Sequence, residues 1–272
     1  MHVDRVRSPV GAGRRITMSA MTQTVLLAID TSTEYCSVAL LRSASADDAV
    51  SPPQTWVRHE PTGAVSSTRV LPAIQELFAE SGLSFADCDA IAFGAGPGSF
   101  TGLRTATGIT QGLAFGRGLP VVPVSTLLAC AEHARLRAPG TTRVLVALDA
   151  RMDEAYWADF AWDDQAGDWR TLHPASLDAP GAVGVPDVPF TLAGNAAAAF
   201  GAQLPAAAAA AVIDGDALPH ALAVAHAALR AFRAGRTVPA DQAAPEYVRD
   251  KVAQTTAERL AARAAQTGGA KG

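Results

Sequence analysis

The chain repeats one local pattern, in which an apolar strand ends in aspartate, turns, and returns as a second strand. The first copy spans residues 25–41 and turns after Asp30. The second copy, about 120 residues later, spans residues 143–162 and turns after Asp149. Internal repetition of such a unit is typical of two related α/β halves. The sequence therefore predicts two lobes of similar construction.

A glycine-rich segment lies between the two copies. Residues 94–104 read Gly-Ala-Gly-Pro-Gly-Ser-Phe-Thr-Gly-Leu-Arg, between an apolar strand at 90–95 and a helix predicted over 103–115. Ser99 or Thr101 can cap this helix. A glycine-rich turn at a helix N-terminus presents backbone N–H groups and the positive end of the helix dipole. Such a turn can hold an anion or a close partner.

The remaining elements follow from apolar periodicity. Strands are expected at 54–59, 119–124 and 190–193, and helices at 66–81, 125–137 and 219–233. Pro72 is costly deep inside a helix, so the helix at 66–81 is expected to start nearer Thr68. Residues 138–142 read Ala-Pro-Gly-Thr-Thr and indicate a domain boundary. The predicted lobes are therefore residues 21–138 and 139–252.

Both ends of the chain differ in composition from these lobes. Residues 1–20 contain four arginines and no apolar stretch typical of a secretory signal. We expect them to be a disordered extension or a mis-called start, with Met21 at the position of a genuine start. Residues 253–272 are polar and rich in Ala and Gly, which predicts a disordered tail.

Charge and cysteine content narrow the function classes. The chain has 22 Lys and Arg against 26 Asp and Glu, a net charge of −4. This balance argues against a protein whose main task is to grip nucleic acid, because a basic face is the usual footprint. Cys36, Cys88 and Cys130 are odd in number and lie in apolar contexts. They are expected to be buried free thiols in a reducing compartment.

The sequence predicts neither a metal site nor a nucleophile. The six histidines include no pair spaced i, i+3 or i, i+4, so no helix presents two ligands on one face. Ser99 lies in a loose G-x-S-x-G pattern with the wrong glycine spacing. Cys130 lies in an apolar helix, where burial raises the pKa of a thiol.

A stripe of three glycines marks the helix after the glycine-rich segment. Gly108, Gly112 and Gly116 are four residues apart and share one face. Each interior glycine costs about 0.5–1 kcal/mol relative to alanine, so the stripe needs a packing reason. Two interpretations stand: close packing on the chain's own sheet, or a helix–helix interface with a partner. An apolar stripe on the helix at 66–81 would share either face: Val70, Ile74, Leu77 and Phe78.

Several of these segments together resemble the TsaB (YeaZ) family. The similarity spans residues 25 to about 252 and is strongest at 28–40, 94–112, 122–126, 148–157 and Pro245-Glu-Tyr-Val-Arg249. The resemblance implies an α/β, actin/sugar-kinase/Hsp70-like (ASKHA) fold with two related lobes and mixed central sheets. It also implies a bacterial cytoplasmic protein needed to make N6-threonylcarbamoyladenosine, next to the anticodon of tRNAs that read ANN codons.

The resemblance further implies a non-catalytic scaffold. In that family the subunit pairs with the transferase TsaD through helices that map onto residues 68–81 and 101–116, and the complex recruits the ATPase TsaE. The free protein self-associates through the same surface, tRNA is reached indirectly through the complex, and no membrane is involved. The expected interface residues are Val70, Ile74, Leu77, Phe78, Thr101, Arg104, Gly108, Gly112 and Gly116.

Nucleotide-using members of the actin/sugar-kinase/Hsp70-like superfamily bind phosphates and Mg²⁺ with two Asp-containing hairpins. Asp30, Thr31, Ser32 and Asp149 stand at the corresponding positions, but neither turn contains glycine. Without glycine the backbone cannot easily approach a phosphate, and Glu34 and Glu154 would repel it. The adenosine loop has a single glycine, Gly194, before Asn195. These turns are therefore expected to be vestigial.

The region around His59 lacks the His-x-x-x-His pair that the catalytic paralogue uses for its metal. We expect no catalytic residue, metal or cofactor of the chain's own, while a nucleotide at the partner interface stays open. Two other functions were weighed. An ATP-dependent enzyme of the sugar-kinase type requires glycine in the phosphate turns. A glycoprotease-like peptidase requires a metal pair or an organised nucleophile.

Overall fold

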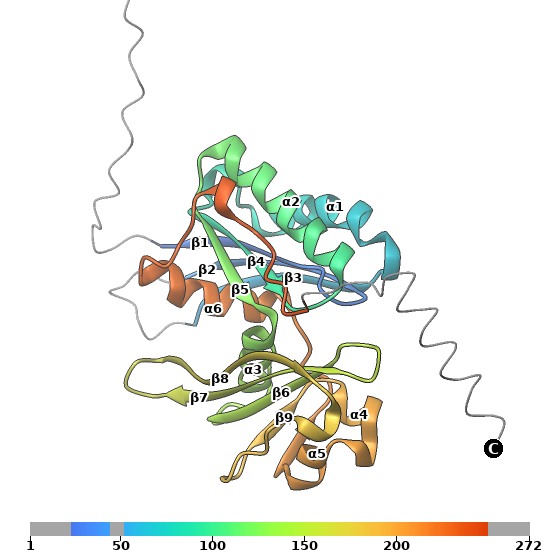
Figure 1. Cartoon of the computed structure of the whole chain (residues 1–272). Coiled ribbons are helices and arrows are strands. Elements are labelled where there is room, and N and C mark those ends of the chain that lie inside the picture. Colours follow the sequence, from blue (N-terminus) through green and yellow to red (C-terminus); the bar gives the residue numbers. More distant parts are fainter. Residues whose placement is uncertain (1–22, 44–51, 250–272) are drawn as a thin grey trace, which may run out of the picture.

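The computed structural model describes residues 23–43 and 52–249, which form two lobes, each built on a five-stranded mixed sheet (Figure 1). In the first sheet β1 pairs antiparallel with β2 and parallel with β4. β3 and β5 form the edges, giving the order β3-β2-β1-β4-β5. The strands are β1 (Val25–Asp30), β2 (Tyr35–Arg42), β3 (Gln54–Pro61), β4 (Ala90–Gly96) and β5 (Val121–Ser125).

The second sheet has the same topology. Its order is β10-β9-β6-β7-β8, in which β6 pairs antiparallel with β7 and parallel with β9. β6 thus takes the place of β1, and β7 that of β2, which confirms the predicted repeat. The strands are β6 (Arg143–Asp149), β7 (Ala155–Asp163), β8 (Asp168–Asp178), β9 (Thr191–Ala193) and β10 (Val212–Asp214).

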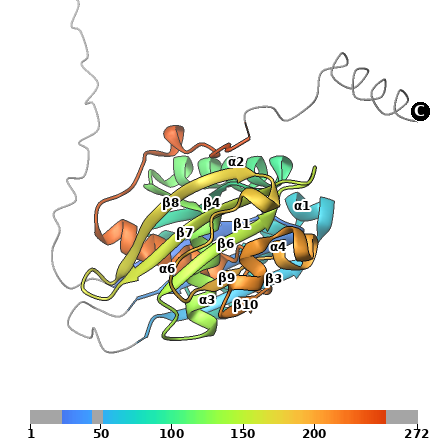
Figure 2. The same ribbon diagram turned by 60° about the horizontal axis from the view of Figure 1, so that its bottom comes forward.

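Helices cover both faces of the first sheet. α1 (Ser66–Ser81) and α2 (Phe100–Arg117) lie on one face, and α6 (Ala221–Arg233) lies on the other (Figure 1). α3 (Thr126–Arg137) lies between the lobes, against α6 and β6. The second lobe carries two short helices beside β9, α4 (Ala196–Phe200) and α5 (Pro205–Ala209), as Figure 2 shows for α4.

β1 lies at the centre of the first lobe and is buried along its whole length. Because side chains alternate along a strand, Leu27 and Ile29 face α1 and α2, while Leu26 and Ala28 face α6. A strand covered on both faces has no polar side, and this explains its nearly continuous apolar sequence.

The last part of the chain corrects the predicted domain boundaries. α6 does not belong to a contiguous lobe over residues 139–252, because it packs on the first sheet. Its alanine-rich face allows close approach to Ala28, Ala39 and Ala92 of that sheet. Val238 then bridges to Val121 of β5, and residues 240–246 run beside α2 and β4.

Two smaller differences concern single elements. α1 begins at Ser66 rather than near Thr68, and Pro72 is accommodated inside it. The carbonyl that this proline leaves without a donor belongs to Thr68, an exposed residue, so water can bond it. The 11-residue strand β8 was not predicted.

The predictions for residues 1–20 and 253–272 lie outside the described residues. Among the helices of the described ranges, none combines the length and apolarity required to cross a membrane.

Candidate functional site

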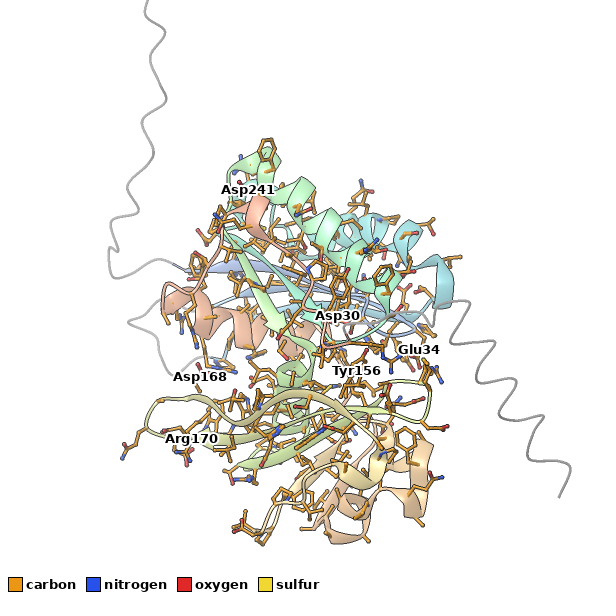
Figure 3. The ribbon with its side chains drawn as sticks, viewed as in Figure 1. Asp30, Glu34, Tyr156, Asp168, Arg170 and Asp241 are labelled. Atoms are coloured by element: carbon orange, nitrogen blue, oxygen red, sulfur yellow. The ribbon has the colours of Figure 1, made fainter. Side chains whose placement is uncertain are left out.

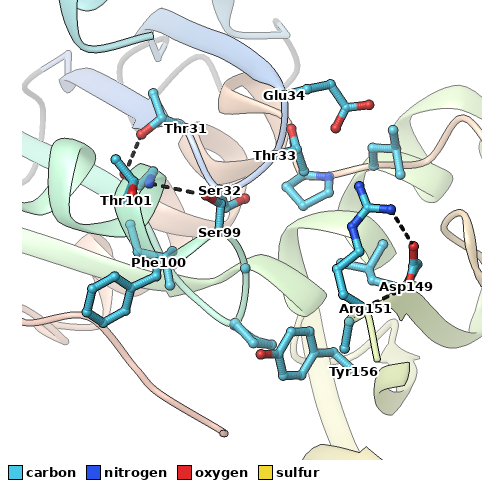
Figure 4. Close-up of a pocket in the computed structure, with 18 of the residues that line it drawn as sticks. Thr31, Ser32, Thr33, Glu34, Ser99, Phe100, Thr101, Asp149, Arg151 and Tyr156 are labelled. Atoms are coloured by element: carbon cyan, nitrogen blue, oxygen red, sulfur yellow. Dashed lines mark hydrogen bonds and ion pairs between the residues drawn. The ribbon is translucent and has the colours of Figure 1, made fainter. Parts of the chain in front are cut away.

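A cavity of about 600 Å³ lies between the two lobes. The turn after β1 and the start of α2 line it from the first lobe, and the turn after β6 lines it from the second (Figure 4). Glu34 and Tyr156 face it from opposite lobes (Figure 3). Residues 246–249 also line it. The structure thus brings together the two aspartate turns and the glycine-rich segment.

The glycine-rich segment packs directly on the first turn. The Ser99 amide donates to the Ser32 carbonyl at 2.8 Å, and the Thr31 hydroxyl donates to the Gly102 carbonyl at 2.6 Å (Figure 4). A Cβ at Gly98 or Gly102 would collide with the carbonyls of Ser32 and Thr31, respectively. These glycines are therefore required by close packing within the chain itself.

Asp30 is buried beneath this contact. One carboxylate oxygen accepts hydrogen bonds from the Ser32 amide at 3.0 Å and the Ser32 hydroxyl at 2.8 Å. The other has no partner among the described residues, and burial raises the pKa of the carboxyl to about 6. Thr31 and Ser32 line the cavity, whereas Asp30 does not. Asp30 therefore organises the turn and is not presented to a ligand.

The second turn holds its aspartate differently. Asp149 accepts hydrogen bonds from the Arg151 amide at 2.8 Å and from its guanidinium at 3.1 Å, so an adjacent cation offsets its charge (Figure 4). Asn195 accepts from the Asp149 amide at 2.8 Å. A Cβ at Gly194 would meet the Ala147 carbonyl. Gly194 and Asn195 therefore support this hairpin.

The backbone after Asp149 is strained. Arg151, Met152 and Asp153 have φ values of 62°, 59° and 56°, all in the left-handed region. This conformation costs roughly 1–2 kcal/mol for each non-glycine residue. The Arg249 guanidinium lies against the turn, where it bonds the Ala150 carbonyl at 3.1 Å and the Glu154 carboxylate at 2.6 Å. These contacts offset part of the strain.

The described residues hold no cluster of three or more His, Cys, Asp or Glu side chains arranged to bind a metal ion. The two nucleophile candidates are both occupied structurally. The Ser99 hydroxyl accepts from the Gly102 amide and caps α2. Cys130 is fully buried, which raises the pKa of its thiol well above the usual value, and Cys36 and Cys88 are buried as well.

Three residues of the expected interface are not available to a partner. Val70, Ile74 and Leu77 are buried against the chain's own first sheet, and Phe78 packs at the edge of the same core. The interface prediction was wrong for Val70, Ile74 and Leu77. An apolar stripe indicates that one face of a helix is buried, but not whether the chain's own sheet or a partner buries it. The α1 stripe packs on the chain's own sheet.

The glycine stripe of α2 faces outward. Gly108, Gly112 and Gly116 are exposed, and a Cβ at each would meet nothing within 4 Å. Packing on the chain's own sheet therefore does not explain these glycines. Thr101 and Arg104 are also exposed.

Two exposed apolar residues of α1 and α2 were missed. Phe115 is 79% exposed between two of the glycines, and Leu71 of α1 is 47% exposed. Both are large apolar residues next in sequence to residues that were singled out. Their positions do not follow the periodicity of the buried stripe, and this could have indicated from the sequence that they are exposed. A small-residue surface with adjacent exposed apolar groups is suited to a protein contact.

Comparison with known proteins shows which family this chain resembles. The model of the family described as "TsaD: tRNA N6-adenosine threonylcarbamoyltransferase" matches residues 61–265. Two relatives are named tRNA threonylcarbamoyladenosine biosynthesis protein TsaB. The Escherichia coli protein is 45% identical over 145 residues, covering 53% of this chain and 58% of the relative. The Haemophilus influenzae protein is 41% identical over 166 residues, covering 59% and 66%, so neither match reaches two thirds of the relative.

A solved structure titled "YeaZ from Pseudomonas aeruginosa" superposes with a TM-score of 0.74 at 37% identity. It covers 82% of this chain and 99% of that one. Two lobes on mixed five-stranded sheets of repeated topology, with a cleft between their aspartate turns, define a protein of the actin/sugar-kinase/Hsp70-like class. Within that class, the chain belongs to the TsaB (YeaZ) family.

Proposed function

We propose that this chain is a non-catalytic subunit of the machinery that adds a threonylcarbamoyl group to N6 of the adenosine next to the anticodon in tRNAs reading ANN codons. The names of the relatives from Escherichia coli and Haemophilus influenzae support this role. The match to the TsaD family over residues 61–265 supports descent from the same scaffold as the transferase. We place the chain in the cytoplasm, where the tRNA is.

The burial of Asp30 is the main observation that supports a non-catalytic role. In a nucleotide-using protein of this class, the first-turn aspartate must face the cleft. Here Asp30 is buried behind the turn, and Asp149 is engaged by Arg151. The same geometry speaks against a sugar-kinase-type enzyme. A peptidase is disfavoured because the Ser99 hydroxyl is engaged as a helix cap.

The exposed face of α2 is the proposed docking surface for TsaD. It consists of Thr101, Arg104, Gly108, Gly112 and Gly116, with Phe115 beside them, and its glycines permit close approach of a second backbone. In the absence of TsaD, a second copy of this chain would cover the same face. Recruitment of TsaE, indirect access to tRNA, and a nucleotide at the TsaD interface complete the proposal, with no resident cofactor.

Replacing Gly112 with leucine tests the docking surface. The site is exposed and helical, so Gly112→Leu should fold normally while its side chain blocks close approach. Ala208→Leu, an equally bulky change on an exposed position of α5, is the matched control. We expect co-elution with TsaD to be lost only in Gly112→Leu. Unchanged co-elution of a folded Gly112→Leu would contradict the proposal.

A further inference from the structure

The docking helix α2 has an inner face of small side chains. Its fully or nearly buried residues include a single large one, Leu103, and the others are Gly102, Ala106, Thr107, Thr110 and Ala114. Small side chains bury little apolar area and give a helix few protrusions to interlock with its neighbours. Ile109 and Leu113 add partly buried contacts to the same core. Because most side chains of the inner face are small, contacts with another segment of the chain can add to those that hold this helix in place.

A segment from the end of the chain supplies further contacts to α2. Residues 243–249, which we call the C-terminal strap, run beside this helix. The Gln111 amide group donates to the Ala243 carbonyl at 2.7 Å, and the Arg104 guanidinium donates to the Tyr247 hydroxyl at 3.0 Å. The same guanidinium lies 3.8 Å from the Phe100 ring centroid. The strap is therefore bonded to α2 at two positions, Arg104 and Gln111.

The strap is also bonded to the sheet beneath the helix. The Glu246 amide donates to the Ala95 carbonyl at 2.7 Å. A Cβ at Gly96, whose φ is +131°, would collide with the Glu246 carbonyl. The glycine at position 96 thus allows the strap to lie directly on the end of β4.

The far end of the strap is anchored in the second lobe. The Arg249 guanidinium bonds the Ala150 carbonyl, the Glu154 carboxylate and, at 3.4 Å, the Met152 sulfur. These groups belong to the left-handed turn after β6, which links two paired strands of the second sheet. The strap therefore connects α2 with a turn of the other lobe.

We propose that Arg249 is a positioning residue for the docking helix: by anchoring the strap to the left-handed turn of the second lobe, it sets the position of α2. This inference rests on the proposed docking of TsaD to α2. It also gives the second lobe a role in a subunit without a catalytic site, because that lobe supplies the fixed point from which the docking helix is held.

Hydrogen exchange and calorimetry on the whole chain test this inference. Arg249→Ala removes the anchor, Arg249→Lys keeps the charge without the forked geometry, and Arg170→Ala changes an exposed arginine of β8 as a control. We expect Arg249→Ala to speed amide exchange in α2 roughly tenfold, while amides of β1 and β6 stay protected. TsaD affinity should fall by roughly tenfold. Arg249→Lys should be intermediate, and Arg170→Ala should match the wild type.

Two results would overturn the inference. One is unchanged α2 exchange and TsaD affinity in Arg249→Ala. The other is faster exchange spread evenly through both sheets, which would show only a general loss of stability. Faster α2 exchange in Arg249→Ala combined with undiminished TsaD binding by Gly112→Leu would instead support the anchoring and refute the docking function. The two proposals therefore fail separately.

Discussion

The Oδ2 atom of Asp30 occupies the place where a side chain at Gly94 would begin. The aspartate at the end of β1 is thereby enclosed by the neighbouring strand β4 and the Ser32 turn. A residue that would face the cleft in a nucleotide-using relative of this fold class is here part of the protein interior. The glycine-rich segment and the first aspartate turn are one packing unit.

Substitution of Gly94 should disturb this unit strongly. Gly94→Ala places a methyl group on the Asp30 carboxylate, and overpacking of this kind costs about 1–3 kcal/mol of unfolding free energy. Gly108→Ala is the matched control, because that site is open and helical, and it should stabilise by about 0.5–1 kcal/mol. Urea unfolding of both variants measures the difference. Equal stability of the two would contradict the packing described for Gly94.

The buried Asp30 carboxyl should make stability depend on pH. Burial raises its pKa from 3.8 to about 6. Its favourable contribution is therefore complete below pH 3.8 and lost as the pH rises through 6, a change of about 3 kcal/mol. Asp30→Asn lacks this ionisation, so its stability relative to the wild type should increase between pH 4 and pH 7. Urea unfolding across that range would show a constant difference if Asp30 titrated normally.

Three histidines with adjacent rings should produce the opposite dependence of stability on pH. The His220 ring lies 4.3 Å from His59 and 4.7 Å from His133, and burial together with these rings lowers its pKa from 6.5 to about 3. Its contribution is present above pH 6.5 and lost as the pH falls toward 3, about 2 kcal/mol of it by pH 5.

His220→Asn isolates this effect, because asparagine can replace the cap that His220 provides to the Leu222 amide. We expect the unfolding free energy of the variant to fall less than that of the wild type between pH 7 and pH 5. Parallel losses in the two proteins would show that His220 does not resist protonation.

A partly buried ion network joins the lobes at the side away from Glu34 and Tyr156 (Figure 3). Glu132 of α3 is buried and bonds the guanidinium of Arg230 at 2.7 Å, and that guanidinium also bonds Asp168 of β8 at 2.9 Å. Arg230→Ala should cost about 3–5 kcal/mol, because it leaves Glu132 buried without its cation.

The exposed pair Arg58–Glu80 is the control for this prediction. Arg58→Ala should cost far less unfolding free energy than Arg230→Ala, since water solvates the remaining charge. Chemical denaturation of both variants provides the comparison. A cost for Arg230→Ala as small as that of Arg58→Ala would mean that water reaches Glu132.

The sequence predicted the two hairpins and most helices because their signals are local. An apolar run ending in aspartate, or a stripe with helical spacing, can be recognised without the rest of the fold. β8 was missed because its residues alternate only weakly and many are exposed. The position of α6 was missed because the sheet that a helix covers depends on contacts distant in sequence.

In the candidate site, too, local features could be predicted from the sequence and contacts between distant segments could not. The glycine stripe on α2 was evident from spacing, but only the structure distinguished an outward face from packing on the sheet. Val70, Ile74 and Leu77 were placed on the wrong side for that reason. Two contacts join segments far apart in the chain: the enclosure of Asp30 by Gly94 and the anchoring of the strap by Arg249. No local sequence pattern predicts them.

Reconstitution of the tRNA modification tests the central claim most directly. Unmodified tRNA, threonylcarbamoyl-adenylate, TsaD and TsaE are combined with and without this chain, and the nucleosides are analysed by mass spectrometry. The account predicts modified adenosine only when this chain and TsaD are both present. Modification by this chain without TsaD would contradict it, as would full modification in its absence.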